Sequence, residues 1–280
     1  MVLEEKTDIA SVHDLIISKI RGFFASCGKS KAVLGISGGI DSALVAALAA
    51  EALGKENVHG ILMPSQFSSL HSVSDSVDLA NNLGIKYDVI PIEKIYKRFM
   101  LEMHNFFEIG KWSVAQENIQ ARARGTILMT YSNRYDALLL NTSNKSELFM
   151  GYGTLYGDLC GALMVIADLY KLQVYELSNY INRSGEIIPK SIIEKAPSAE
   201  LRPGQKDTDS LPDYKILDPV LHALHEEELT FDEVITSKGV DRELLERILR
   251  LKKGAAFKIM QIPPVLTVGD KPVVPPFKCI

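Results

Sequence analysis

A short polar segment, "SGGIDS" from Ser37 to Ser42, stands directly between two apolar runs. Its two glycines, Gly38 and Gly39, carry no side chain and can take positive φ, so an anionic group can approach the backbone closely. A helix that begins near Asp41 would add unpaired amides and a partial positive charge at its start. The hydroxyls of Ser37 and Ser42 are further donors. These features predict a loop that binds a phosphate or pyrophosphate group.

Asp41 is unexpected in an anion site, because its carboxylate would repel bound phosphates. A divalent cation between them removes that repulsion, and carboxylate oxygens are typical ligands of Mg²⁺. Helix capping is the alternative, since Ser and Asp are common at helix starts. Capping accounts for Asp41 or Ser42 singly, but not for two glycines directly after an apolar strand. The segment matches neither the GxxxxGK[ST] phosphate loop nor the GxGxxG dinucleotide fingerprint.

The elements that position this loop follow from the hydrophobic pattern. Short apolar runs at 32–37, 57–64, 85–92 and 136–143 are typical of buried strands. Helical spacing occupies the segments between them, at 11–28, 41–53, 72–84 and 93–133. This alternation predicts an α/β fold, a doubly wound, Rossmann-like parallel sheet. Helical patterns at 159–183 and 231–258 predict a C-terminal helical extension.

A second carboxylate belongs to the same predicted edge. Glu147 follows the fourth strand through "NTSNKSE". Because the carboxyl ends of parallel strands lie at one edge of a sheet, Glu147 is expected on the same side as Asp41. The alternative is a capping-box glutamate after Ser143 or Asn144.

The loop resembles the SGGxDS pyrophosphate loop (PP-loop) of the ATP-pyrophosphatase superfamily. Three later segments, 117–129, 138–158 and 195–214, together resemble ammonia-dependent NAD synthetase, in order, over residues 12–264. The resemblance implies one NAD synthetase domain over 1–280. It would comprise an ATP-binding core at about 12–180, a substrate flap at about 195–219, and C-terminal helices and tail at 220–280.

The resemblance also implies the reaction. Deamido-NAD (nicotinic acid adenine dinucleotide), ATP and ammonia would give NAD, AMP and pyrophosphate, the final step of NAD biosynthesis, with ATP as co-substrate and Mg²⁺ as cofactor. A carboxylate does not react usefully with ammonia, because hydroxide is a poor leaving group. Transfer of AMP to the carboxylate gives an acyl adenylate, from which AMP departs easily. Such an enzyme needs a pyrophosphate cradle, a metal and shelter from water.

Residue by residue, the resemblance makes Asp41 and Glu147 the metal ligands and adds Lys171 as the third catalytic side chain. A lone helical Lys is otherwise usually solvated. The implied nucleotide-binding positions are Gly35, Ile36, Ser37, Gly38, Gly39, Ile40, Asp41, Ser42, Thr142, Lys171 and Ser198. Ser198 stands where many members have threonine, so a hydroxyl is retained.

For the dinucleotide substrate, Arg122 is the first candidate, and Arg124, two residues on, points to a different helix face. Asp158 matches a position near the nicotinate end, with a helix-start cap as its alternative. The sequence departs from the expected pattern at Leu155, where many members have lysine. At the C-terminus, Phe257 and Lys258 stand where a His-Lys pair is usual.

The bulk properties set outer limits. A net charge of −4 without a Lys/Arg-rich stripe gives no indication of nucleic-acid binding. Three scattered cysteines fit a reducing compartment, and Cys160 is expected to be buried. We expect no signal peptide, no membrane span and a cytoplasmic location.

The remaining expectations concern motion and partners. Residues 63–75 and 195–219 are predicted to be lids that order only on nucleotide binding. We find no glutaminase segment, so ammonia is expected to be free or supplied by a separate glutaminase. The resemblance implies a homodimer through helices at 116–133 and 159–180, whose apolar residues could equally be monomer core. Alternatives are another superfamily adenylase, such as a tRNA-thiolating enzyme, or a non-catalytic nucleotide-sensing domain.

Overall fold

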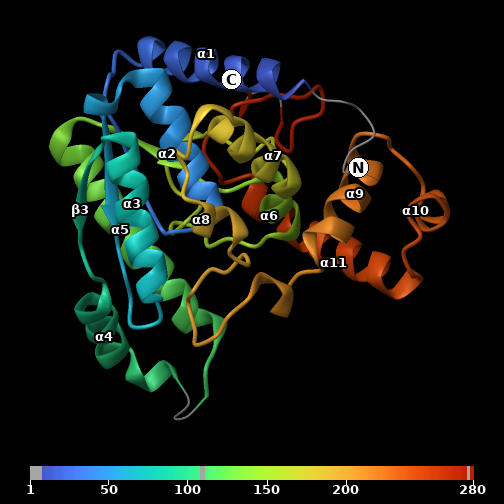
Figure 1. The fold of residues 1–280 in the computed structure, drawn as a ribbon. Coiled ribbons are helices and arrows are strands. Elements are labelled where there is room, and N and C mark those ends of the chain that lie inside the picture. Colours follow the sequence, from blue (N-terminus) through green and yellow to red (C-terminus); the bar gives the residue numbers. More distant parts are fainter. Residues whose placement is uncertain (1–7, 108–110, 276–277) are drawn as a thin grey trace.

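The computed structural model describes residues 8–107, 111–275 and 278–280. Its centre is a parallel sheet that lies among the helices (Figure 1). The strand order is β3-β2-β1-β4-β5. From β1 the chain first moves outward through β2 and β3, and then returns to place β4 on the other side of β1. This reversal confirms the predicted doubly wound fold and puts a switch point between β1 and β4. The strands are β1 (Ala32–Gly35), β2 (Val58–Leu62), β3 (Lys86–Val89), β4 (Leu138–Asn141) and β5 (Leu163–Met164).

Helices cover both faces of the sheet. Successive side chains of β1 point to opposite faces. Leu34 packs into the cluster formed with α1, α2 and α7, whereas Val33 packs into the cluster on the α5 side. The helices of this part are α1 (Ile9–Ser26), α2 (Ile40–Leu53), α3 (Leu70–Leu83), α4 (Glu93–Glu102), α5 (Val114–Tyr135), α6 (Lys145–Met150), α7 (Lys171–Ile181) and α8 (Lys190–Glu194). The α2 helix is buried almost all round, which explains why its sequence is so uniformly apolar.

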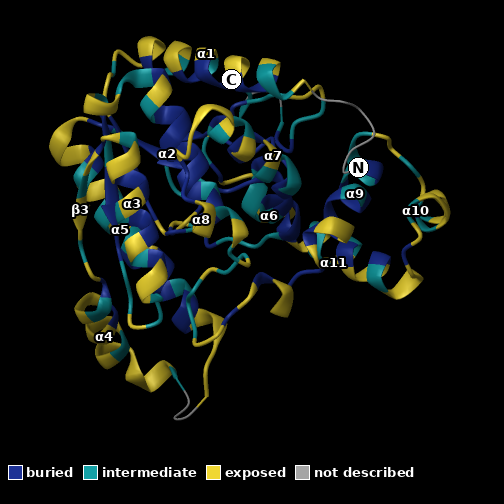
Figure 2. Ribbon diagram, in the orientation of Figure 1, coloured by how far each residue is buried: buried dark blue, intermediate teal, exposed yellow. Residues whose placement is uncertain are grey.

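The C-terminal extension has a hydrophobic cluster of its own. Figure 2 shows buried faces of α9 (Tyr214–His225) and α11 (Arg242–Ile259). Leu217, Val234 and Leu245 are fully buried there, with α10 (Phe231–Lys238) and α6 completing the cluster. The tail returns to the sheet, where Val265 bridges both Met164 and Cys279. The extension therefore packs directly beside the end of the sheet that carries β5.

Three expectations about this region were wrong. The segment 159–170 is not helical: it holds the short strand β5, and Leu163 to Ile166 are fully buried core rather than a dimer surface. The flap does not extend to Pro219, because α9 begins at Tyr214 and includes that proline. Cys160, which we expected to be buried, is only half-buried.

Within the described residues, no helix combines the length and the hydrophobicity needed to cross a bilayer. Short 3₁₀ segments occupy Lys55–Asn57, His104–Phe106, Asn182–Ser184 and Asp207–Asp209.

Candidate active site

A cavity opens at the carboxyl ends of three adjacent strands. The segments that follow β1, β2 and β4 all line it, and the flap segment 195–201 lines its far side. Parallel strands place their carboxyl ends together, and ligands of doubly wound sheets bind at this edge. The predicted positions Gly35, Ile36, Ser37, Gly39, Ile40, Asp41, Ser42, Thr142, Lys171 and Ser198 all line this cavity.

The loop after β1 is held by its own serines. Ser42 Oγ accepts a hydrogen bond from the Ser37 amide at 3.2 Å and donates one to the Gly39 carbonyl at 3.0 Å. Gly39 is the N-cap of α2, and no side chain caps this helix. The capping alternative for Asp41 and Ser42 is therefore wrong. Instead, α2 begins at the cavity wall without a side-chain cap, as an anion-binding helix start requires.

Gly38 has a different role from the one expected. It does not line the cavity, its φ is +78°, and a Cβ there would lie 2.4 Å from the Ser72 carbonyl oxygen. A side chain at this position is excluded by α3, not by a ligand. Of the two adjacent glycines, Gly39 is the one that lines the cavity.

Three charged side chains from distant segments meet beside this loop. Lys171 Nζ lies 2.5 Å from Asp41 Oδ2 and 3.8 Å from Glu147 Oε1. Lys171 is the first residue of α7 and is almost completely buried, so the solvated-lysine alternative is wrong. Asn144 Nδ2 donates to the other oxygen of Asp41 at 2.9 Å. The two carboxylates predicted as metal ligands therefore face one point.

Glu147 serves two purposes at once. Its Oε2 accepts from the Asn144 amide at 3.2 Å, and its amide donates to Asn144 Oδ1 at 3.0 Å, which is a capping box for α6. Its other oxygen, Oε1, is the one that faces Lys171. The capping alternative is correct, and it leaves half of the carboxylate free for the site.

The site is short of positive charge. Burial, and then the charge of Asp41, raise the pKa of Glu147 well above its ordinary value, and Lys171 offsets this only in part. Burial also raises the pKa of Asp207, whose carboxylate accepts from Tyr152 and Tyr214. For Lys171, burial disfavours the ammonium, but Asp41 and Glu147 outweigh burial and raise its pKa. Asp41, Glu147 and Asp207 thus surround a single lysine, and this excess of negative charge favours the binding of a further cation.

This donor set fits Mg²⁺ in one particular way. Among the described residues, no three His, Cys, Asp or Glu side chains are grouped to hold a metal. Asp41 and Glu147 would thus be two protein ligands, with phosphate oxygens and water supplying the others, as is usual for Mg²⁺.

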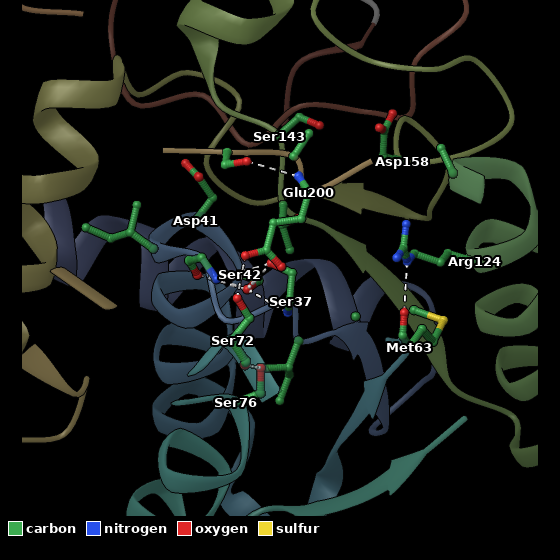
Figure 3. A pocket seen from close by; sticks show the side chains of 18 of the residues that line it. Ser37, Asp41, Ser42, Met63, Ser72, Ser76, Arg124, Ser143, Asp158 and Glu200 are labelled. Atoms are coloured by element: carbon green, nitrogen blue, oxygen red, sulfur yellow. Dashed lines mark hydrogen bonds between the residues drawn. The ribbon is translucent and has the colours of Figure 1, made fainter. Parts of the chain in front are cut away.

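The opposite side of the cavity carries Arg124 and Asp158 (Figure 3). Arg124 Nε donates to the Met63 carbonyl at 3.0 Å, and burial lowers its pKa to about 10 against the attraction of Asp158. Asp158 is open to the cavity, but the protein behind it desolvates the carboxylate and raises its pKa to about 6. It accepts from the Thr154 amide at 2.5 Å within a turn, so it caps no helix.

Arg122, the first candidate, lies elsewhere. It is exposed, outside this cavity, and its Nε donates to the Leu155 carbonyl at 3.2 Å. The signal for Arg124 was available: it stands three residues after Ala121 and four before Leu128, on the face of α5 that lines the cavity. Arg122 as a substrate contact stays a prediction.

The other expected substrate residues, Leu155, Phe257 and Lys258, lie outside the main cavity. Leu155 lines a shallower hollow with Met129 and Gln261. Phe257 is exposed on α11. Lys258 Nζ donates to the carbonyls of Gly151 and Gly153, so it fastens the loop that leads to Asp158. Their contact with a substrate is untested.

The two predicted lids are connected by Glu200, which sequence reasoning missed. Its carboxylate accepts from the Ser69 amide, the Ser72 hydroxyl and Lys195. Glu200 lines the same cavity as Ser37 and Ser42 (Figure 3). Burial would raise the pKa of Glu200, but the bonds from Lys195 and Ser72 outweigh it and lower the value. Ser198 Oγ donates to the Gln205 carbonyl at 2.6 Å, so it orders the flap as well as lining the cavity.

A doubly wound parallel sheet with an uncapped, glycine-preceded helix at its switch point defines an α/β nucleotide-binding protein. Comparison with known families goes further. The NAD synthase family model matches residues 12–262, nearly the whole chain, and the chain belongs to that family.

Individual relatives agree. The chain is 47% identical over 264 residues to a glutamine-dependent NAD(+) synthetase of Synechocystis, covering 94% of this chain but 47% of that protein. The solved NH3-dependent NAD synthetase of Campylobacter jejuni superposes with a TM-score of 0.74 at 33% identity, covering 93% of this chain and 100% of that one. A glutamine-dependent NAD+ synthetase of Acinetobacter baumannii, solved with ADP, superposes with a TM-score of 0.66 at 36% identity. The match covers 94% of this chain and 48% of that one. The chain spans about half the length of the curated relatives it matches.

Proposed function

We propose that this chain makes NAD from deamido-NAD, ATP and ammonia, releasing AMP and pyrophosphate. Family membership supports the reaction class. The observation that carries the proposal is the meeting of Asp41, Glu147 and Lys171 beside an uncapped helix start. That arrangement suits a nucleoside triphosphate, because the negative charge of its leaving pyrophosphate must be balanced by nearby positive charge and amide donors.

The reaction would proceed in two steps. A nicotinate carboxylate oxygen attacks the α-phosphorus of ATP, and the bond from that phosphorus to the pyrophosphate oxygen breaks. Ammonia then attacks the acyl carbon, the bond to the AMP oxygen breaks, and the nitrogen loses a proton. The α2 amides, the hydroxyls of Ser37 and Ser42, and Lys171 would hold the departing pyrophosphate.

The remaining residues take positions around these steps. Asp41 and Glu147 would hold Mg²⁺, which when bound neutralises phosphate charge. Glu147 must be ionised for this, and its raised pKa makes that state dependent on a neighbouring cation. Arg124 and Asp158 lie across the cavity, where the nicotinate end of the substrate would reach. Thr142 and Ser198 offer hydroxyls to the nucleotide.

The nitrogen source is the finer part of the proposal. The curated relatives are named glutamine-dependent, and this chain spans about half their length. The Campylobacter neighbour, which it covers completely, is named NH3-dependent. We propose that the residues of this chain use ammonia, either free or delivered by a glutaminase unit. We also propose that 12–180, the flap and the C-terminal helices act as one catalytic unit, and a homodimer and a cytoplasmic location remain expectations.

A direct assay tests this. The chain is incubated with ATP, Mg²⁺ and deamido-NAD, with either ammonium or glutamine, and NAD and AMP are measured. We expect equal amounts of NAD and AMP with ammonium only. Asp41→Asn should abolish turnover, while Asp241→Asn, which changes a remote helix cap, should keep it. Pyrophosphate release without NAD would favour another adenylating enzyme, and NAD formed from glutamine would overturn the proposed nitrogen source.

A further inference from the structure

The N-terminus of α7 is held by residues that lie far away in the sequence. The Lys171 amide donates to Ser146 Oγ at 3.0 Å, and the Leu172 amide donates to Asp218 Oδ2 at 2.8 Å. The N-cap of α7, Tyr170, makes no side-chain bond to these amides. Because the first amides of a helix have no partner within it, Ser146 and Asp218 complete this helix start.

These two side chains are also bonded to each other. Ser146 Oγ donates to Asp218 Oδ1 at 2.6 Å, and both residues are completely buried. Each oxygen of the Asp218 carboxylate therefore has one defined partner. The serine hydroxyl accepts from Lys171 while it donates to Asp218, so a single chain of hydrogen bonds joins α6, α7 and α9.

This chain of bonds runs directly behind the charged site. Ser146 is the residue before Glu147 on α6, and Lys171 begins α7. The position of Lys171 Nζ between Asp41 and Glu147 therefore depends on how the start of α7 is held against α6. A short serine hydroxyl tolerates little change in that spacing, because hydrogen bonds weaken steeply with distance and angle.

A second contact from α9 reaches the same lysine. Tyr214 stands four residues before Asp218, so both lie on one face of α9. The Tyr214 ring lies 5.4 Å from Lys171 Nζ, and its hydroxyl donates to Asp207 at 3.0 Å. The α9 helix thus contacts the start of α7 twice: Asp218 accepts from the amide of Leu172, and Tyr214 packs against the side chain of Lys171.

We propose that Asp218, acting through Ser146, is a positioning residue that sets the separation of Lys171 and Glu147 for MgATP binding. This rests on the proposed function of the site. It assigns a role to the C-terminal extension, which lies outside the ATP-binding core predicted from sequence. Neither residue lines the cavity, so both act without touching a ligand.

The test is a double-mutant cycle with Asp218→Asn and Ser146→Ala, both small changes. MgATP binding is measured by calorimetry without deamido-NAD, and NAD formation is measured against Mg²⁺ and ATP. We expect each variant to raise the MgATP Kd and the half-maximal Mg²⁺ concentration at least fivefold. The double variant should be no worse than the poorer single variant, because the two residues share one chain of bonds.

Asp168→Asn is the matched control. Asp168 is also buried, and its Oδ2 accepts from the backbone amides of Val268 and Gly269, which fastens the tail. Its Oδ1 lies 3.1 Å from Lys145 Nζ, and within the described part of the chain Asp168 makes no hydrogen bond or ion pair with the start of α7. We expect Asp168→Asn to lower the melting temperature while leaving the MgATP Kd within twofold. The proposal is overturned if Ser146→Ala and Asp218→Asn behave like this control, or if their effects simply add. If the unaltered chain binds MgATP but makes no NAD, the proposed function fails while the positioning role is still decided by the calorimetry.

Discussion

Lys171 Nζ lies 2.5 Å from Oδ2 of Asp41, although 130 residues separate the two in the sequence. Asp41 belongs to the first turn of the helix after β1, and Lys171 begins the helix after β5. Their contact is possible because both strands end at one edge of a parallel sheet. The ion pair connects the loop after β1 to the start of α7, which also contacts the C-terminal extension.

Replacing Lys171 with methionine should impair both catalysis and stability. Asp41 and Glu147 would face each other without their cation, and breaking such a pair costs on the order of 3 kcal/mol. We expect NAD formation to fall at least a hundredfold and the melting temperature to drop. Mg²⁺ should restore part of the lost stability, because a divalent ion can replace the missing charge. Thermal unfolding with and without Mg²⁺ measures this.

Lys195→Met provides a comparison for that experiment, since Lys195 pairs with Glu200 in the flap and is more exposed. Its stability should respond much less to Mg²⁺. Equal Mg²⁺ responses of the two variants would contradict the metal role assigned to Asp41 and Glu147.

Gly38 and Gly39 should respond differently to alanine. At Gly38 the positive φ and the Ser72 carbonyl leave no room for a Cβ, so Gly38→Ala should lower the melting temperature strongly. At Gly39 the nearest atom to a Cβ is Ser37 Oγ, at 3.4 Å, so Gly39→Ala should fold normally. Because Gly39 faces the cavity, the second variant should instead lose MgATP affinity, by tenfold or more. Melting curves and calorimetry separate the effects, and a stable, fully binding Gly38→Ala protein would argue against this loop geometry.

The ionisation of Asp218 should appear in the pH dependence of stability. Burial raises its pKa from 3.8 to about 6, so between these values the folded state holds a proton that the unfolded state has released. The free energy of unfolding must then fall as pH rises through this window, by roughly 3 kcal/mol from this group. The stabilisation that Asp218 gives the folded state is fully present below pH 3.8 and is lost above pH 6.

Urea unfolding at several pH values between 3.5 and 7 measures this, on the unaltered chain and on Asp218→Asn. The variant should show a visibly smaller fall, while Asp158, whose pKa is also raised to about 6, contributes in both proteins. Identical pH profiles would show that Asp218 does not titrate as proposed.

Glu200 should control how firmly the flap is attached. Its carboxylate holds Ser69 and Ser72 at the start of α3, so Glu200→Ala removes the bonds between the two predicted lids. We expect faster proteolysis within 195–210, with MgATP protecting the unaltered chain more than the variant. Glu194→Ala, in the same region but at the exposed end of α8, is the control. If MgATP leaves cleavage of the unaltered chain unchanged, the lid prediction fails.

The sequence alone was sufficient for the place of the SGGIDS loop between a strand and a helix, for four of the strands, and for the family. These features depend on residues that are close in the sequence. A loop, its strand and its helix are adjacent in the chain, and the spacing of apolar residues indicates each element within a few residues. The same local signal failed at 159–170, where a run that is buried on all sides has no periodicity to distinguish strand from helix.

Only the tertiary structure decided which side chains meet. It brought Lys171 to Asp41 and Glu147, put Arg124 rather than Arg122 in the cavity, and placed Asp218 behind the site. These outcomes depend on how helices from distant parts of the chain pack and rotate against the sheet. No short stretch of sequence contains that information, because each contact is made by two segments whose positions are fixed by the whole core.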